Sequence, residues 1–221
     1  MERLEDLNLL GLKIYQDDSL YCFTSDAVLL SHFATAKKGD LVADFCSGSG
    51  IVGLNFYGLN NNLVKEVHAF EMQPEMCALC DKTIKYNGLE NVFTLHNAKL
   101  QDIDSTFNEK FSLVLCNPPY MDKNSGFSAE EYKIAVCKAE IELTLTELIK
   151  AVSKCLKFGG RFCVVHRADR LCELFYEMKN HNIEPKKMQL VYGGKKEPYL
   201  VLVEGVKGGK SGLKVMRPIE N

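Results

Sequence analysis

The sequence lacks the features that would place it in a membrane or in an oxidising compartment. No apolar run is long enough to span a bilayer, and the first residues lack the basic and apolar regions of a signal peptide. The nine cysteines are odd in number, and several stand inside apolar runs, which favours reduced, buried thiols over a disulfide framework. We therefore expect a cytoplasmic protein without a membrane segment.

Metal-binding patterns are missing as well. The five histidines show no ligand spacing, and Cys77-x-x-Cys80 stands alone in a predicted helix, so buried packing is the favoured interpretation of this pair. Internal repeats and a linker between domains are absent, and 221 residues suit one domain of ordinary size. The sequence therefore predicts a single domain without a metal centre, and it indicates no particular oligomeric state.

Charge is distributed unevenly along the chain. The net charge is −2, but residues 1–120 carry −7 and residues 121–221 carry +5. An acidic half beside a basic half is typical of a protein that meets a polyanion with one face. We expect the polyanion contacts of such a face among six residues near the predicted fifth strand and beyond it, namely His166, Arg167, Lys186, Lys187, Lys195 and Lys196.

Strand and helix patterns alternate from residue 41 onward. Short apolar runs that predict strands are separated by helical patterns, and they include Leu41–Phe45, Glu66–Glu71 and Phe111–Cys116. This alternation predicts an α/β fold, in which a mostly parallel seven-stranded sheet carries helices on both faces and the last strand is antiparallel.

Outside this core we expect two further segments. Residues 13–16 and 20–23 predict a hairpin, and Thr24-Ser25-Asp26 is a helix N-cap signal. The hairpin and helix would form an N-terminal segment over 1–38, followed by the core domain over 39–206 and an exposed tail over 207–221.

Two stretches at predicted strand ends indicate a nucleoside ligand. Asp44-Phe45-Cys46-Ser47-Gly48-Ser49-Gly50 follows the first core strand and precedes a helix, at the edge where open α/β sheets bind ligands. Glu71 ends the second core strand, and a carboxylate there can accept both hydroxyls of a ribose. A dinucleotide fits, because Gly48, Gly50 and Gly53 satisfy the GxGxxG pattern, and so does S-adenosylmethionine. Asp44 favours the latter, because it suits an ammonium and repels a pyrophosphate.

A third stretch, Asn117-Pro118-Pro119-Tyr120, suits a planar group that carries an amino group. It follows a predicted buried strand, and its two prolines end that strand in a stiff turn. The side-chain oxygen of Asn117 and the carbonyl of Pro118 can each accept one amino hydrogen, and Tyr120 can stack on the planar face.

The three stretches together resemble class I S-adenosylmethionine-dependent methyltransferases that methylate amino groups. More narrowly, the chain resembles the bacterial tRNA1(Val) adenine N6-methyltransferase family, also through Phe23–Leu30, Val164–Arg167 and Glu184–Lys187. The resemblance implies the Rossmann-like class I methyltransferase fold, S-adenosyl-L-methionine as cofactor and tRNA as partner. It implies a catalytic clamp from Asn117, Pro118, Pro119 and Tyr120. It places the cofactor beside Asp26, Asp44, Cys46, Gly48, Gly50, Glu71, Met72 and Asn97.

Three positions depart from the family pattern. Cys46 replaces the first glycine of the loop, so the turn must accept a Cβ there. Asn97-Ala98-Lys99 stands where an acidic residue often binds the adenine amino group; Lys99 cannot accept that bond, and Asn97 or Asp102 can substitute for the acidic residue. Lys138-Ala139-Glu140 replaces Arg-His-Glu, a segment with which relatives contact RNA.

Other functions stay open at this point. A protein glutamine N5-methyltransferase, or another rRNA or DNA amino-methyltransferase, would use the same clamp. Glutamine methyltransferases carry a substantial helical domain before the core, whereas only about 40 residues precede the first core strand here. A binding module without catalysis is the third hypothesis, and it gives no chemical reason for an intact Asn117–Tyr120 stretch.

Overall fold

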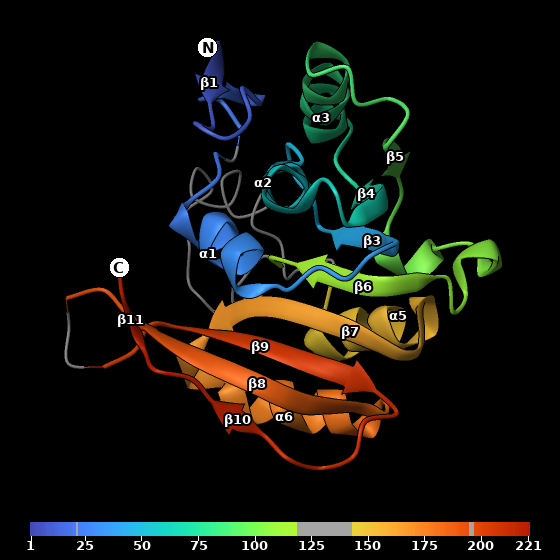
Figure 1. Cartoon of the computed structure of the whole chain (residues 1–221), viewed down its shortest axis with the longest axis vertical. Helices are drawn as coiled ribbons and strands as arrows, with labels where there is room; N and C mark the ends of the chain where they lie inside the picture. Colours follow the sequence, from blue (N-terminus) through green and yellow to red (C-terminus); the bar gives the residue numbers. More distant parts are fainter. Residues whose placement is uncertain (21, 119–142, 195–196) are drawn as a thin grey trace, which may run out of the picture.

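A computed structural model describes residues 1–20, 22–118, 143–194 and 197–221. Their main feature is a nine-stranded sheet in the order β10-β8-β9-β7-β6-β3-β4-β5, with β11 also paired to β8 (Figure 1). The long strands are β3 (Asp40–Phe45), β4 (Val64–Glu71), β5 (Phe93–Asn97), β6 (Phe111–Cys116), β7 (Leu156–Arg167), β8 (Ile183–Tyr192) and β9 (Leu200–Lys207).

The sheet is parallel from β7 to β5, and β9 runs antiparallel between β7 and β8. This confirms the predicted fold class, including the antiparallel last long strand. The described residues form nine strands in this sheet rather than seven, because β10 (Lys214–Val215) and β11 (Ile219–Glu220) add two short pairings along β8. The segment expected as an exposed tail therefore pairs with the sheet.

Helices cover both faces and enclose one apolar core on each. Within the described residues the helices are α1 (Ser25–Phe33), α2 (Ile51–Asn60), α3 (Pro74–Tyr86), α5 (Leu145–Cys155) and α6 (Leu171–Asn180), with short 3-10 turns at 100–102, 105–107 and 168–170. Side chains of β6 alternate between the two cores: Leu113 and Leu115 join the core under α1 and α2, whereas Val114 and Cys116 join the core under α5 and α6. Within the described ranges, no helix is both long and apolar enough to cross a membrane.

The start of β7 is irregular. α5 ends at Cys155 and β7 begins at once with Leu156, ahead of Gly159-Gly160. The pairing of β7 with β6 shifts between Phe111 and Leu113. Both glycines lie in this irregular stretch, where Gly159 adopts a φ of +74° that other residues rarely accept.

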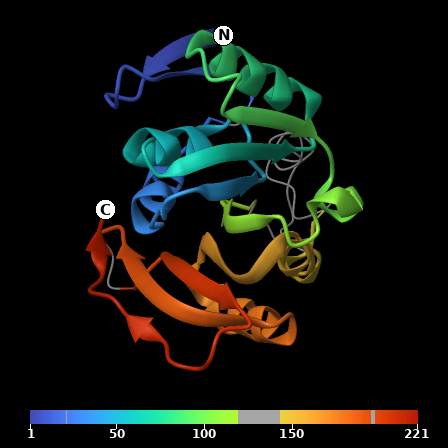
Figure 2. The ribbon, with the colours of Figure 1, turned by 45° about the vertical axis from the view of Figure 1, so that its right-hand side comes forward.

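The N-terminal hairpin also pairs differently from the prediction. Its strands are β1 (Glu2–Asp6) and β2 (Lys13–Asp17), and residues 20–23 contribute no strand within the described part. The hairpin docks on α3: the Tyr15 N–H donates to Thr83 Oγ1 at 3.1 Å, and the Asn87 amide exchanges two hydrogen bonds with the Lys13 backbone. Figure 2 shows the hairpin beside α3, at the end of the molecule opposite the C-terminal strands.

A buried ion pair joins strands at the edge of the sheet that is remote from the carboxyl ends of the parallel strands. Arg161 on β7 donates to Asp40 Oδ2 at 2.6 Å and to the Thr35 carbonyl, and both charged side chains are almost fully buried. The Ser112 hydroxyl on β6 donates to Asp40 Oδ1 at 2.7 Å. Three neighbouring strands are thus joined at the edge remote from the carboxyl ends of the parallel strands.

Candidate active site

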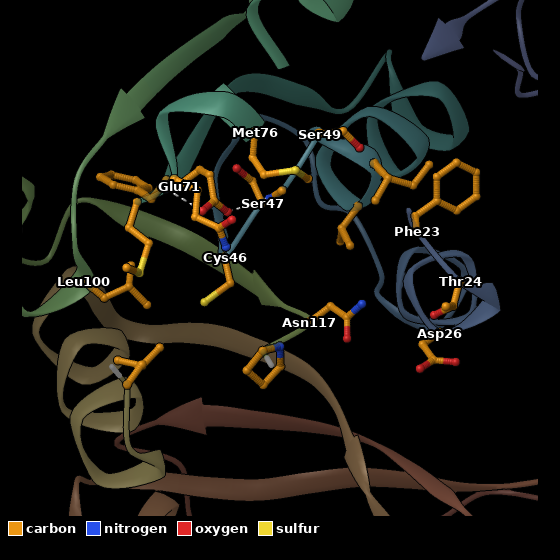
Figure 3. A pocket seen from close by; sticks show the side chains of 18 of the residues that line it. Phe23, Thr24, Asp26, Cys46, Ser47, Ser49, Glu71, Met76, Leu100 and Asn117 are labelled. Carbon is orange, nitrogen blue, oxygen red and sulfur yellow. Dashed lines mark hydrogen bonds between the residues drawn. The ribbon is translucent and has the colours of Figure 1, made fainter. Parts of the chain in front are cut away.

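A cavity of about 770 Å³ opens at the carboxyl ends of β3, β4 and β6 (Figure 3). This volume suits a ligand of the size of a nucleoside with a side chain. Eight residues predicted for the site line it: Asp26, Cys46, Gly48, Glu71, Met72, Asn117, Pro118 and Arg167. The topology therefore brings together stretches that are far apart in the sequence, as expected for an open parallel sheet.

The loop after β3 is shaped by backbone conformations that favour glycine. Gly48 and Gly50 adopt φ values of +56° and +90°, and a Cβ on Gly50 would lie 2.8 Å from Cys80 Sγ. Cys46 adopts a φ of +57° despite its side chain, so the turn accepts a Cβ at this position as the sequence required. Cys77 and Cys80 are buried behind the loop, which confirms that they pack in the core.

Glu71 holds the loop from the end of β4. Its Oε2 accepts the Gly48 N–H at 2.8 Å, and its Oε1 accepts the Gln73 N–H at 2.9 Å. Only 6% of the residue is exposed, and burial raises the pKa of its carboxyl, whereas the backbone N–H groups oppose that rise. The Met72 N–H also bonds this carboxylate. Its two oxygens offer about four acceptor sites, so Glu71 can still accept a hydroxyl donor from a ligand in the cavity.

Asp44 lies directly beneath this loop and outside the cavity lining. It is fully buried, and its Oδ2 accepts the Gly53 N–H at 2.8 Å. Burial raises the pKa of Asp44 to about 7; the Gly53 bond lowers it and the Glu71 carboxylate raises it further. Asp44 Oδ1 and Ser47 Oγ have no hydrogen-bond partner among the described residues. A buried, partnerless carboxylate oxygen is costly, and a cationic ligand at the loop would compensate for that cost.

Asn117 and Pro118 line the cavity between the glycine loop after β3 and the residues at the start of α1. Figure 3 shows Asn117 between Cys46 on the loop side and Thr24 and Asp26 at the start of α1. Pro119 and Tyr120 of the predicted clamp lie outside the described residues, as does the segment Lys138-Ala139-Glu140.

Asn97 is not part of the cavity lining; it hydrogen-bonds the backbone at the end of β4. Its Nδ2 donates to the carbonyl oxygens of Glu71 and Met72, each at 3.0 Å. Ala98, Leu100 and Gln101 line the cavity beside it. Gln101 is an amide that the sequence analysis missed, because it lies in a 3-10 turn after β5 that has no motif of its own.

Several residues on the α1 side of the cavity were also missed. Phe23 and Thr24 precede α1, Asp169 follows β7, and Tyr199 precedes β9. Arg167 makes a two-point ion pair with Asp169, through Nε to Oδ1 at 3.0 Å and through NH2 to Oδ2. Burial also raises the pKa of Asp26 on this side.

The remaining residues predicted to contact RNA lie away from the cavity lining or outside the described ranges. His166 is 1% exposed, and burial lowers its pKa to about 4. Lys187 donates to the Phe33 carbonyl at 3.0 Å and lies 3.6 Å from Glu204, and Lys186 donates to the Lys210 carbonyl at 2.9 Å. Lys195 and Lys196 are outside the described residues. Among the residues that are described, no cluster of three His, Cys, Asp or Glu side chains could hold a metal ion.

Comparisons with curated proteins give two informative relatives. The chain is 27% identical over 200 residues to the tRNA1(Val) (adenine(37)-N6)-methyltransferase of Flavobacteriaceae bacterium (strain 3519-10). The matched region covers 83% of this chain and 81% of the relative. It is 25% identical over 153 residues to the protein of the same name from Shewanella sp. (strain MR-4), covering 67% of this chain and 63% of that one.

Solved structures share the fold at lower sequence identity. The structure of the M. jannaschii TYW2 in complex with AdoMet superposes with a TM-score of 0.65 at 13% identity, covering 92% of this chain and 84% of that one. The M. jannaschii tRNA m1G37 methyltransferase gives 0.63 at 17% identity, covering 95% and 55%. These identities show the fold alone. The family model for the methyltransferase small domain matches residues 23–185, and the chain therefore belongs to the methyltransferase small domain family.

Proposed function

We propose that the protein transfers a methyl group from S-adenosyl-L-methionine to the exocyclic N6 amine of an adenosine in tRNA. The observation that carries the proposal is the placement of Asn117 and Pro118 in the same cavity as the Cys46–Gly50 loop and Glu71. An amino-group clamp and a nucleoside site thus share one space. The names of the curated relatives support adenine 37 of tRNA1(Val), in the anticodon loop, as the target to test first.

The loop side of the cavity fits the cofactor of this family. The unpartnered Asp44 Oδ1 beneath the loop suits a cationic ligand, and Glu71 can accept ribose hydroxyls beside Met72. Leu100 and Phe70 give this side an apolar wall that suits an adenine ring. S-adenosyl-L-methionine, when bound, supplies an electrophilic methyl group.

Asn117 and Pro118 then act on the nucleophile. The lone pair of an adenine N6 is delocalised into the ring, which makes this nitrogen a poor nucleophile. Two acceptors on its hydrogens favour a pyramidal nitrogen with a localised lone pair. Positive charge develops on that nitrogen as the new bond forms, so the two acceptors stabilise the transition state more than the ground state. The remaining contribution is alignment of the reacting atoms. A stacked base cannot enter this cavity, and a flipped or loop nucleotide can.

The first experiment identifies the substrate class. Tritium transfer from labelled cofactor is measured into bulk tRNA, rRNA and protein, followed by nucleoside analysis of the labelled fraction. Label recovered as N6-methyladenosine from tRNA supports the proposal. Label in glutamine of the protein fraction would refute it in favour of a protein glutamine methyltransferase, and label in rRNA alone would refute the tRNA assignment.

The second experiment tests the role of Asn117. Asn117→Ala removes one acceptor from the amino group and leaves the loop side intact, so S-adenosylhomocysteine binding should persist while single-turnover methylation slows by about a hundred- to a thousandfold. Asn60→Ala is the matched control, since the Asn60 amide donates to the Phe56 carbonyl within α2 and Asn60 is not among the residues that line the cavity. A wild-type rate in Asn117→Ala would show that the clamp lies elsewhere.

A further inference from the structure

Gln16, in the second strand of the N-terminal hairpin, bridges the two sides of the cavity without lining it. The residue is only 2% exposed. Its Nε2 donates to Ser49 Oγ at 3.3 Å, and its Oε1 accepts the Phe23 N–H at 3.2 Å. One buried amide therefore uses its donor on one partner and its acceptor on another, and the partners are 26 residues apart in the sequence.

The two partners belong to opposite sides of the cavity. Ser49 lies in the loop between β3 and α2, flanked by Gly48 and Gly50, and it lines the cavity. Phe23 begins a short wall, formed by Phe23, Thr24 and Asp26, that lines the cavity on the α1 side. Figure 3 shows Ser49 and Phe23 on neighbouring parts of the rim, with Thr24 and Asp26 continuing from Phe23.

The wall is also fixed from outside by a second amide. Asn221, just after β11, donates to Ser25 Oγ at 2.9 Å and to Tyr199 Oη at 2.7 Å. Gln16 thus links the wall to the loop through its side-chain amide, whereas Asn221 links the wall to Tyr199, directly before β9.

The chemistry of the bridge makes it sensitive to loop position. If the loop shifts around a bound ligand, the glycines on both sides of Ser49 accept the new backbone angles at little cost. The Gln16 amide must then follow Ser49 or leave a buried donor unsatisfied, which is unfavourable. Following Ser49 moves the acceptor that holds the Phe23 N–H, and with it the start of the wall.

We infer that Gln16 is a positioning residue that couples cofactor binding at the glycine loop to the placement of the substrate-side wall Phe23–Asp26. The inference rests on the proposed function for the identity of the two ligands. Filling the loop site orders the wall through the amide, so cofactor and RNA strengthen each other's binding, and by the same factor in both directions.

The variant that tests this is Gln16→Met, which keeps the length of the side chain and removes both hydrogen bonds. Thr83→Val is the matched control: it removes a neighbouring hairpin bond, from the Tyr15 N–H to Thr83 Oγ1, which joins the hairpin to α3. Thermal unfolding of both variants establishes that each is folded, and a defect caused by loosened hairpin docking would appear in both.

The first readout is independent of the substrate. Hydrogen exchange of peptides spanning residues 23–30 is followed with and without S-adenosylhomocysteine. In the wild type and in Thr83→Val the cofactor product should slow exchange over this wall. In Gln16→Met that protection should be lost, although S-adenosylhomocysteine still binds. Equal protection in Gln16→Met, or none in the wild type, would overturn the inference.

The second readout is the affinity for an anticodon stem-loop of tRNA, measured with and without S-adenosylhomocysteine. The wild type should bind RNA about three- to tenfold more tightly with the cofactor product, the range expected for one or two neutral hydrogen bonds. Gln16→Met should bind the stem-loop equally with and without S-adenosylhomocysteine. The double variant Gln16→Met/Ser49→Ala should show the same absence of enhancement, because both changes remove the same bridge. RNA binding with full enhancement in Gln16→Met would refute the coupling. Absence of RNA binding in every protein would refute the proposed substrate, while the exchange result would still decide the role of Gln16.

Discussion

Asp44→Asn should make the protein more stable while weakening its cofactor site. Asp44 accepts the N–H of Gly53, the third residue of α2, and so caps that helix from the preceding strand. An asparagine oxygen can accept the same bond. The substitution therefore keeps the cap, and it removes a charge that the fully buried carboxyl carries above its pKa of about 7.

The magnitude follows from the pKa. Burial raises the pKa of Asp44 from 3.8 to about 7; because a shift of one pKa unit corresponds to about 1.4 kcal/mol, ionising this group costs the folded state on the order of 4 kcal/mol above pH 7. The asparagine NH2 still lacks a partner, at a cost of about 1–3 kcal/mol. A net gain of about 1–3 kcal/mol remains, or about 2–10 °C in Tm for a chain of this size.

The stability difference between Asp44→Asn and the wild type should change with pH in a defined direction. The folded state holds the Asp44 proton more tightly than the unfolded chain, so the wild type loses stability from this group as pH rises from about 4 to about 7. The advantage of Asp44→Asn should therefore be absent near pH 4, grow across this window and stay constant above it. Asp104→Asn is the control, because Asp104 is an exposed cap whose pKa is lowered by the Thr106 N–H, and its loss should give no stabilisation.

Thermal melts from pH 4 to 8, without ligand, provide the assay. A variant that is no more stable than the wild type at pH 8 would refute the claim that a buried, uncompensated charge sits under the loop. Calorimetry with S-adenosylhomocysteine tests the weakened cofactor site: affinity should fall, by at most the roughly ten- to a hundredfold of one charge-assisted hydrogen bond, because Asp44 lies beneath the loop and not in the cavity lining.

Three further predictions test other parts of the structure. Glu71→Ala should weaken S-adenosylhomocysteine binding by roughly ten- to a hundredfold in calorimetry; unchanged affinity would remove Glu71 from the site. Arg161→Met leaves Asp40 buried without its ion pair and should cost about 3–5 kcal/mol in urea unfolding without altering cofactor affinity. Asn221→Ala should raise the Michaelis constant for tRNA about fivefold through loss of its bonds to Ser25 and Tyr199, with cofactor affinity unaltered.

The sequence predicted the parts of the fold that depend on local pattern. The run Phe111–Cys116 is apolar because both faces of β6 are buried, and such a run is visible without any partner. The glycines at 48 and 50 were recognisable because their backbone angles require them. The order of strands and helices then placed the loop, Glu71 and Asn117 at one edge of the sheet, through the rule that ligands bind at carboxyl ends.

The parts that were missed depend on contacts between distant residues. The hairpin formed by β1 and β2 is held on Thr83 and Asn87 by backbone bonds from β2, and no pattern within residues 1–23 reports these contacts. β10 and β11 are two residues long, too short for any alternation of polar and apolar residues to appear. Gln16 looks like a surface residue in the sequence, and it is buried only because Ser49 and Phe23 come to it from other elements.

The geometry around Asp44 also distinguishes between the two ligands that the glycine pattern allows, a dinucleotide and S-adenosylmethionine. A dinucleotide places its pyrophosphate at the N-terminus of the helix after the glycines, where free backbone N–H groups and the helix dipole attract it. In this protein α2 begins at Ile51, and the Gly53 N–H of its first turn is already bonded to Asp44. A Cβ at residue 53 would lie 3.0 Å from Asp44 Oδ2, so this third glycine serves the approach of a carboxylate rather than of a phosphate. A pyrophosphate would meet the charge of Asp44 and that of Glu71 nearby, whereas a cation would relieve both. The same pattern of glycines thus prepares the loop for a positively charged ligand, and absence of NADH binding in calorimetry is the corresponding expectation.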